Sequence, residues 1–170
     1  MILIGMGANL HHPQFGEPLN SLKAAVEEIR NRNVMIVSQS SYYRSAPVPI
    51  SDQPWFVNAV LTVETDLNVS GILSLLHDVE FVFGRVRKEK WEARVLDLDL
   101  LAYHDDVTAN QDQKAGSVVP HPHMHERAFV LAPLAEIQPD WSHPVLNKSA
   151  ASLLEGLAGD QVFEIIPVET

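Results

Sequence analysis

Apolar runs alternate with amphipathic stretches along the first part of the chain. Residues 1–6 form a continuous apolar run of the kind that becomes a buried strand, and residues 34–40 and 56–65 are expected to form two more strands. Between the first two, apolar residues recur at helical spacing over residues 18–30, where Pro18 suits the first turn of a helix. The pattern therefore predicts a strand, a helix and two further strands, in that order.

The alternation continues into the middle of the chain. Ser70 is expected to cap a second helix, whose apolar stripe ends at Phe83 and which Gly84 closes. Residues 95–103 are expected to form another strand. The order β-α-β-β-α-β is typical of a ferredoxin-like split unit. The sequence thus predicts an α+β fold with a ferredoxin-like βαββαβ core, a mostly antiparallel sheet and helices packed on one face.

The segments outside this core are expected to be less regular. Residues 44–54 are rich in proline, which fixes φ and removes backbone donors, so an ordered loop without regular structure is predicted there. Further along, residues 104–116 are expected to form a polar loop. Two C-terminal helices are expected over residues 126–137 and 149–157, and a short strand over residues 162–166. No linker separates these segments, so we expect a single domain that spans residues 1–170.

Composition narrows the class of protein. The 170 residues are 46% apolar and 20% charged, which disfavours disorder. No apolar run approaches the roughly 20 residues that a membrane span needs, and no N-terminal signal is visible, so we expect a cytoplasmic protein without membrane contact. The absence of cysteine excludes thiolate metal sites and a cysteine nucleophile. The net charge of -10 disfavours nucleic-acid binding, and one core that uses up the apolar residues favours a monomer.

Positive charge is concentrated in one short stretch. Residues 85–94 hold five of the chain's 12 Lys and Arg residues and only two acidic ones, a local charge of +3. The cations are Arg85, Arg87, Lys88, Lys90 and Arg94. A cationic loop on an acidic protein suggests a small anionic ligand, although a merely solvated loop explains the charge alone equally well.

Two aspartates directly follow the basic stretch. On a strand, Asp97 and Asp99 would share one face with their Cα atoms about 7 Å apart, while the leucines between and beside them face the core. Two carboxylates on one face repel each other unless a cation lies between them, and paired Mg²⁺ ions are one such solution. The alternative is an exposed strand face with two solvated aspartates. Carboxylates for Mg²⁺ beside cations for phosphate are typical of phosphoryl transfer.

A histidine-rich segment forms the next candidate. His121, His123 and His125 alternate, which could indicate zinc, but Pro122 breaks the strand geometry that would bring them together. We expect His121 to donate a hydrogen bond to phosphate and the other two to be surface residues. Arg127 could reach the same phosphate, or it could pair with an acidic neighbour on its own helix.

An aromatic side chain and an amide form the third candidate. Phe56 and Asn58 share a face of the expected strand, so together they could stack on a flat heterocycle and bind its edge. Phe129 could supply the opposite plane. Taken by spacing alone, an ordinary core Phe and a strand-end Asn remain the simpler interpretation.

Taken together, these segments resemble the 6-hydroxymethyl-7,8-dihydropterin pyrophosphokinases of folate biosynthesis along nearly the whole chain. The resemblance rests on GANL at 7–10, SYYRS at 41–45, DQPWFVN at 52–58, GRVR at 84–87, RVLDLD at 94–99 and PHPHMHERAF at 120–129. It implies Mg²⁺-dependent transfer of pyrophosphate from ATP to the pterin hydroxymethyl oxygen, with release of AMP. The implied partners are therefore ATP, the dihydropterin and two Mg²⁺ ions.

The resemblance also implies roles for individual residues. Its magnesium-binding positions are Asp97 and Asp99. Its ATP-binding positions are Glu80, Arg85, Arg87, Trp91, Arg94, His121 and Arg127, and its pterin-binding positions are Ser45, Val48, Phe56, Asn58 and Phe129. The implied catalytic positions are Arg85, Arg94, Asp97 and Asp99, without an assigned general base. The chain departs from the family at Glu92 in the basic stretch, at Phe56 where a Tyr is frequent, and at His77 where a Gln is common.

Two other classes of function stay open at this point. A nucleotide-binding regulatory module on a ferredoxin-like scaffold would need no chemistry, and the fold alone does not exclude it. The paired aspartates argue against it, because a binding module has little need of two metals. A zinc hydrolase built on the histidines is the third possibility.

Overall fold

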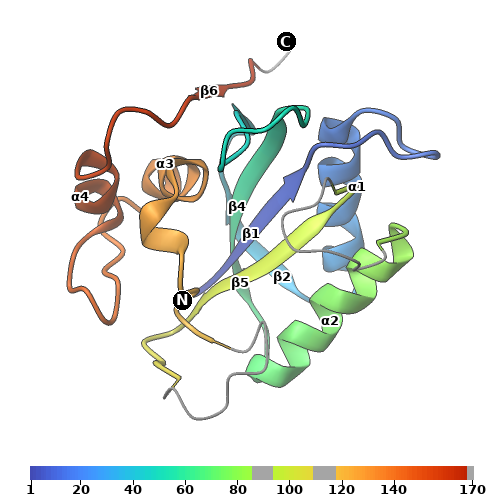
Figure 1. Ribbon diagram of the computed structural model, residues 1–170. Coiled ribbons are helices and arrows are strands. Elements are labelled where there is room, and N and C mark those ends of the chain that lie inside the picture. The colour runs from blue at the N-terminus through green and yellow to red at the C-terminus, as the bar shows by residue number, and fades with distance from the viewer. Residues whose placement is uncertain (86–93, 109–117, 168–170) are drawn as a thin grey trace.

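The computed structural model describes residues 1–85, 94–108 and 118–167, and its centre is a six-stranded sheet (Figure 1). The strands are β1 (Ile2–Ala8), β2 (Met35–Gln39), β3 (Tyr43–Ser45), β4 (Phe56–Glu64), β5 (Asp97–Tyr103) and β6 (Phe163–Ile165). They lie in the order β5-β1-β4-β3-β6, and β2 also pairs with β4. Every pairing is antiparallel. The mostly antiparallel sheet predicted from the sequence is confirmed.

Helices cover both faces of this sheet (Figure 1). They are α1 (Pro18–Asn31), α2 (Val69–Val82), α3 (Ala128–Ile137) and α4 (Ala150–Glu155), with a short 3₁₀ turn, η1 (Met124–Glu126), before α3. The first two pack on one face, as expected for the ferredoxin-like core, and the last two lie on the other. The two helices of the predicted βαββαβ core therefore share one face of the sheet, as expected, and the C-terminal helices cover the other.

The alternation of side chains along β1 explains the two layers. Ile2, Ile4 and Met6 belong to the larger apolar cluster with α1 and α2, whereas Leu3 belongs to a smaller cluster with residues of α3 and α4. Successive side chains on a strand point to opposite faces, so a single strand contributes to both clusters. The face toward α3 is less completely filled, and the pocket described below lies there.

Several boundaries differ from those that the sequence pattern predicts. The side chain of Asn68 rather than Ser70 caps α2, accepting a hydrogen bond from the backbone N–H of Gly71. Phe83 is the C-cap of that helix, and Gly84 follows it with a φ of 83°, a conformation that glycine adopts without strain. Residues 44 and 45, expected in an irregular loop, belong to β3, which pairs with both β4 and β6.

The two later elements also begin elsewhere than expected. The helix predicted to start near Glu126 begins at Ala128, because residues 124–126 form the 3₁₀ turn. The strand predicted from Val95 begins at Asp97. Over the described residues, no helix combines the length and the apolar composition that crossing a membrane requires.

A buried tyrosine links β3 to α3. The hydroxyl of Tyr43 donates a 2.7 Å hydrogen bond to Oε2 of Glu136, while Oε1 of the same carboxylate accepts from the backbone and hydroxyl of Ser41. Burial, followed by the hydrogen bond and charge of Glu136, raises the pKa of Tyr43. The phenol is therefore a neutral donor to a charged acceptor, which is a strong type of protein hydrogen bond.

We expect the Tyr43→Phe variant to lose about 2 kcal/mol of unfolding free energy, the usual cost of a hydrogen bond to a charged group. Urea denaturation followed by circular dichroism measures this. Tyr103→Phe is the matched control, because the Tyr103 hydroxyl donates to a neutral acceptor, the carbonyl of Leu67, at 3.1 Å. The control should lose about 1 kcal/mol. Equal losses in the two variants would contradict a special contribution from Glu136.

Candidate active site

A pocket of about 860 Å³ opens on the sheet face that carries α3. Its floor includes two glycines of β1, Gly5 opposite Asp99 and Gly7 opposite Asp97 on β5. A Cβ atom at Gly5 would come within 3.3 Å of the Leu101 side chain, and one at Gly7 within 3.3 Å of Oδ1 of Asn58. The absence of side chains at these two positions therefore keeps the floor open beside the aspartates.

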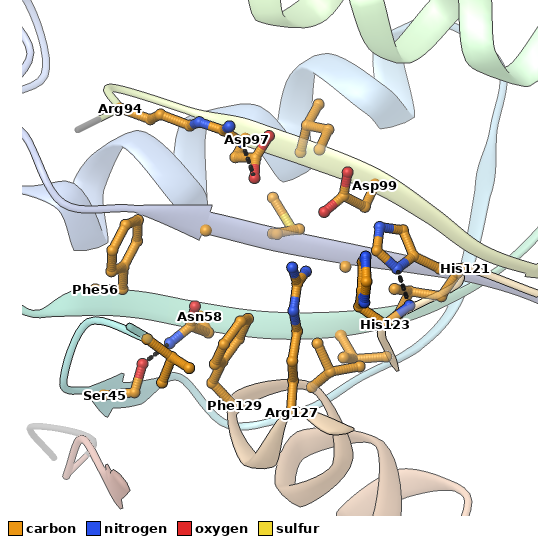
Figure 2. Close-up of a pocket in the computed structure, with 18 of the residues that line it drawn as sticks. Ser45, Phe56, Asn58, Arg94, Asp97, Asp99, His121, His123, Arg127 and Phe129 are labelled. Atoms are coloured by element: carbon orange, nitrogen blue, oxygen red, sulfur yellow. Dashed lines mark hydrogen bonds and ion pairs between the residues drawn. The ribbon is translucent and has the colours of Figure 1, made fainter. Parts of the chain in front are cut away.

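The two aspartates share the pocket face of β5, as predicted. Leu98 and Leu100 pack into the core with α1 and α2, while Asp97 and Asp99 line the pocket (Figure 2). Oδ1 of Asp97 accepts a hydrogen bond from Nη1 of Arg85 at 2.5 Å, and its Oδ2 lies 2.6 Å from Nη1 of Arg94. Asp97 is thus bound between two guanidinium groups.

The surroundings shift the pKa values of the two carboxyls in opposite directions. Burial raises the pKa of Asp97, but the charges and hydrogen bonds of Arg94 and Arg85 lower it by more, so its net pKa lies below the ordinary value. Burial, and then the charge of Asp97, raise the pKa of Asp99 above its ordinary value despite three nearby arginines. Asp99 is therefore a half-buried carboxylate in an environment that a further positive charge would stabilise.

Glu80 lies behind this group rather than in the pocket. It comes from α2, its side chain is 3% exposed, and it forms an ion pair with Arg85, whose side chain is 7% exposed. Arg85 in turn binds Asp97, so a chain of charges runs from α2 to β5. The sequence suggested Glu80 as an ATP contact. In the structure it does not line the pocket formed by the described residues, and its visible role is to hold Arg85.

The histidine-rich segment contributes one half-buried imidazole and one arginine to the pocket. Nδ1 of His121 accepts a 3.2 Å hydrogen bond from the backbone N–H of His123, which leaves the ring proton on Nε2. Burial, then the charge of Arg127, lower the pKa of His121 to about 4, so the ring is neutral at pH 7. Arg127 reaches from the start of α3 toward β5 (Figure 2). Both side chains line the pocket, as predicted.

The three histidines do not converge on one point. His123 pairs with Glu126 at 3.2 Å, whereas the ring of His125 packs against that of His143 with centroids 5.9 Å apart. No cluster of three or more His, Asp or Glu side chains suited to a metal occurs within residues 1–85, 94–108 and 118–167. This geometry gives the zinc interpretation no support. His123 is exposed, as expected, while His125 is 32% exposed and packs one side of its ring against a second histidine.

All five residues suggested for the pterin line the same pocket. They are Ser45, Val48, Phe56, Asn58 and Phe129. Nδ2 of Asn58 donates a 2.7 Å hydrogen bond to Oγ of Ser45, and both side chains are buried. Figure 2 shows Phe56, Asn58 and Phe129 grouped toward one end of the pocket, with His121 and His123 toward the other. The aromatic and amide groups thus gather at one end, and β3, which the sequence pattern missed, supplies Ser45.

Asn9 joins three segments around the pocket, a role that the sequence pattern did not reveal. Its side chain is almost fully buried, and Oδ1 accepts a hydrogen bond from the backbone N–H of Arg94 at 2.8 Å. Nδ2 donates to Oε1 of Gln53 and to the carbonyl of Pro54, both at 3.1 Å. The one available signal was an Asn directly after a buried strand.

Two of the suggested ATP contacts, Arg87 and Trp91, lie outside the described residues.

Comparison of the chain with known proteins identifies its family. Residues 3–139 match a family model described as 7,8-dihydro-6-hydroxymethylpterin-pyrophosphokinase (HPPK). Two relatives are named 2-amino-4-hydroxy-6-hydroxymethyldihydropteridine pyrophosphokinase. The one from Haemophilus influenzae is 39% identical over 164 residues, which is 96% of this chain and 97% of the relative. The one from Methylorubrum extorquens is 38% identical over 138 residues, which is 81% and 82% of the two chains.

A solved structure supports the fold. Plasmodium falciparum HPPK-DHPS superimposes with a TM-score of 0.71 at 14% identity, covering 91% of this chain and 42% of that one. This chain therefore spans less than half the length of that protein, and the likeness supports the ferredoxin-like α+β architecture alone. The family itself rests on the sequence match and the close relatives. The chain is a pyrophosphokinase and belongs to the 7,8-dihydro-6-hydroxymethylpterin pyrophosphokinase family.

Proposed function

We propose that this protein transfers pyrophosphate from ATP to the hydroxymethyl oxygen of 6-hydroxymethyl-7,8-dihydropterin and releases AMP, a step of folate biosynthesis. The observation that carries the proposal is the joining of two chemistries in one pocket. The same pocket presents two aromatic rings and a carboxamide, and beside them two carboxylates with arginines and a neutral histidine. We further propose that residues 1–170 act as one domain, since both apolar clusters pack on the same sheet.

The aromatic end suits a flat, nitrogen-rich ring. Phe56 and Phe129 can stack on the two faces of the dihydropterin. The amide of Asn58 can bind its edge, and the hydrogen bond to Ser45 holds that amide in one orientation, with Nδ2 as the donor toward Ser45. Val48 also lines the pocket.

The carboxylate pair fits Mg²⁺. Asp97 and Asp99 present only oxygen donors on one half-buried face of β5, and the raised pKa of Asp99 is in line with a site that an added positive charge would stabilise. We propose two Mg²⁺ ions at these residues, which when bound would neutralise the triphosphate oxygens and orient them. Arg85 is then better described as a positioning residue, because its guanidinium pairs with Glu80 and with Asp97.

The remaining groups act on the phosphates directly. Arg94, Arg127 and the Nε2–H of His121 are donors that can bind phosphate oxygens and stabilise the charge that builds up during transfer. The hydroxymethyl oxygen attacks the β-phosphorus, the bond from that phosphorus to the oxygen bridging the α-phosphate breaks, and AMP leaves with that oxygen. The hydroxymethyl proton is released in the same step. Positioning and electrostatics supply most of the rate in such a reaction, so a strong general base is not required.

The decisive experiment is nucleotide analysis. Purified protein with ATP, Mg²⁺ and the dihydropterin should release AMP in equal amount to the pterin diphosphate formed. Chelation with EDTA should stop the reaction, and added Mg²⁺ should restore it. Release of ADP in place of AMP would contradict pyrophosphate transfer. Binding of ATP without any turnover would instead favour the regulatory module.

A further inference from the structure

The start of α3 carries two pocket side chains on either side of its first residue. Arg127 is the N-cap residue, with an extended backbone at φ -117° and ψ 111°, and Phe129 follows Ala128. The guanidinium carbon of Arg127 lies 5.6 Å from the centroid of the Phe129 ring. A change of backbone angle at this point would therefore move both side chains together.

A glutamine from the far end of the chain binds this helix start. Arg127 makes no side-chain capping hydrogen bond, although the first N–H groups of a helix need partners from outside it. Oε1 of Gln161 accepts from the backbone N–H of Ala128, and Nε2 of Gln161 donates to the carbonyl of Glu126, both at 2.8 Å. These two groups belong to the peptide units on either side of Arg127. One carboxamide thus fixes both φ and ψ of Arg127.

The segment that follows Gln161 is anchored to β3, the strand that supplies Ser45 to the pocket. The next residue, Val162, accepts a 3.1 Å hydrogen bond from the backbone N–H of Ala46. The chain then enters β6, where Phe163 pairs with Ser45 of β3. This C-terminal segment lies outside residues 3–139, which match the family model, and yet it connects the strand of Ser45 with the helix of Arg127.

We propose that Gln161 is a positioning residue for the transfer reaction, aiming Arg127 at the phosphates and Phe129 at the pterin ring. The inference rests on the proposed function, since it assigns a purpose to the two side chains that Gln161 places. Gln161 itself does not line the pocket formed by the described residues, so it acts through the backbone of α3. A cap that served stability alone would not need to bracket a pocket residue with both of its polar atoms.

The experiment compares three variants at a temperature where all are folded. Gln161→Leu removes both hydrogen bonds at similar size, and Gln161→Glu keeps the acceptor for Ala128 but loses the donor to Glu126. The matched control is Gln138→Leu at the other end of α3, where no side-chain hydrogen bond is seen among the described residues. Calorimetry measures the Kd of a non-hydrolysable ATP analogue with Mg²⁺ and the Kd of the dihydropterin, and AMP release gives kcat/KM.

We expect Q161L to weaken binding of the ATP analogue about tenfold and to weaken pterin binding as well. The factor by which kcat/KM falls should be at least as large as the greater of these two losses in affinity. Q161E should lie between Q161L and wild type, and Q138L should stay within about twofold of wild type. A merely structural cap would lower the melting temperature and leave both dissociation constants unchanged, which would overturn the proposal. If Q161L does not fold, wild-type constants in folded Q161E would overturn it equally.

These outcomes separate the inference from the function on which it rests. If the wild-type protein binds neither substrate and releases no AMP, the proposed function itself fails. If wild type turns over normally and the Gln161 variants match it, the reaction stands and only the positioning role is wrong.

Discussion

The Asp99→Asn variant should lose about 10³-fold or more in turnover, while its metal-free form should be at least as stable as wild type. Asparagine has the same shape but no charge, so the pocket would keep its form and lose half of the proposed magnesium site. The loss in turnover follows because the metals, and the charges that bind them, carry most of the electrostatic stabilisation in phosphoryl-type transfer.

The gain in stability follows from the placement of Asp99. Burial and the neighbouring charge of Asp97 raise its pKa in the folded protein, which means that ionising it opposes folding. The unfolded state ionises at a lower pH, so the stability of metal-free wild type should fall as pH rises from the unfolded pKa through the folded one. This fall should be absent in Asp99→Asn. Near neutral pH we expect the variant to be more stable by about 1 kcal/mol.

The two measurements are AMP release with saturating Mg²⁺ and urea denaturation in EDTA over a range of pH. Asp106→Asn, an exposed aspartate beyond the end of β5, is the control and should change neither quantity. Turnover of the Asp99→Asn variant within tenfold of wild type would contradict the proposal that Asp99 binds the metal. A variant that is clearly less stable than wild type without metal would show that the carboxylate serves the fold.

The features that the sequence predicted well are those that depend only on residues close together in the chain. The period-two pattern around Asp97 and Asp99 placed both carboxylates on one face, because alternation along a strand depends only on neighbouring residues. The same local pattern predicted Ser70 as the cap of α2, whereas Asn68 is the cap. Both residue types can cap, and only the observed bond from Gly71 distinguishes them.

What the sequence missed depends on distant partners. The strand β3 is only three residues long and exists because β4 and β6 flank it. Asn9 binds a backbone group 85 residues away, and Gln161 binds one 33 residues away. No spacing rule links such positions. The family resemblance implied that Glu80 contacts the nucleotide, whereas its burial behind Arg85 follows only from the packing of α2 against β5.

The second large effect is expected at Arg85, which links Glu80 to Asp97. All three groups are largely buried, and removing one member of a buried ion pair leaves charge in a poorly solvated place. Arg85→Met should therefore lower the free energy of unfolding by about 3 kcal/mol. Turnover should also fall by about 10²-fold, because Asp97 loses the group that orients it.

A double variant separates these two consequences. Glu80→Gln combined with Arg85→Met replaces the deeper ion pair with uncharged side chains, so most of the lost stability should return. Turnover should stay low, since Asp97 would still lack Arg85. The exposed pair of Arg44 and Glu164, changed to Met and Gln, is the matched control and should cost well under 1 kcal/mol. Urea denaturation and AMP release measure both quantities on every variant.

The pattern of recovery decides how the charges are arranged. If the double variant regains stability and not turnover, Glu80 serves to keep Arg85 in place and Arg85 serves Asp97. If it regains both, Asp97 is oriented well enough by Arg94 alone, and the contact from Arg85 has no part in the reaction. If it regains neither, the contact between Arg85 and Asp97, rather than the deeper pair with Glu80, carries the stability of this corner of the fold. Each result assigns the guanidinium to one carboxylate or the other, because the two ion pairs share the same nitrogen, Nη1 of Arg85.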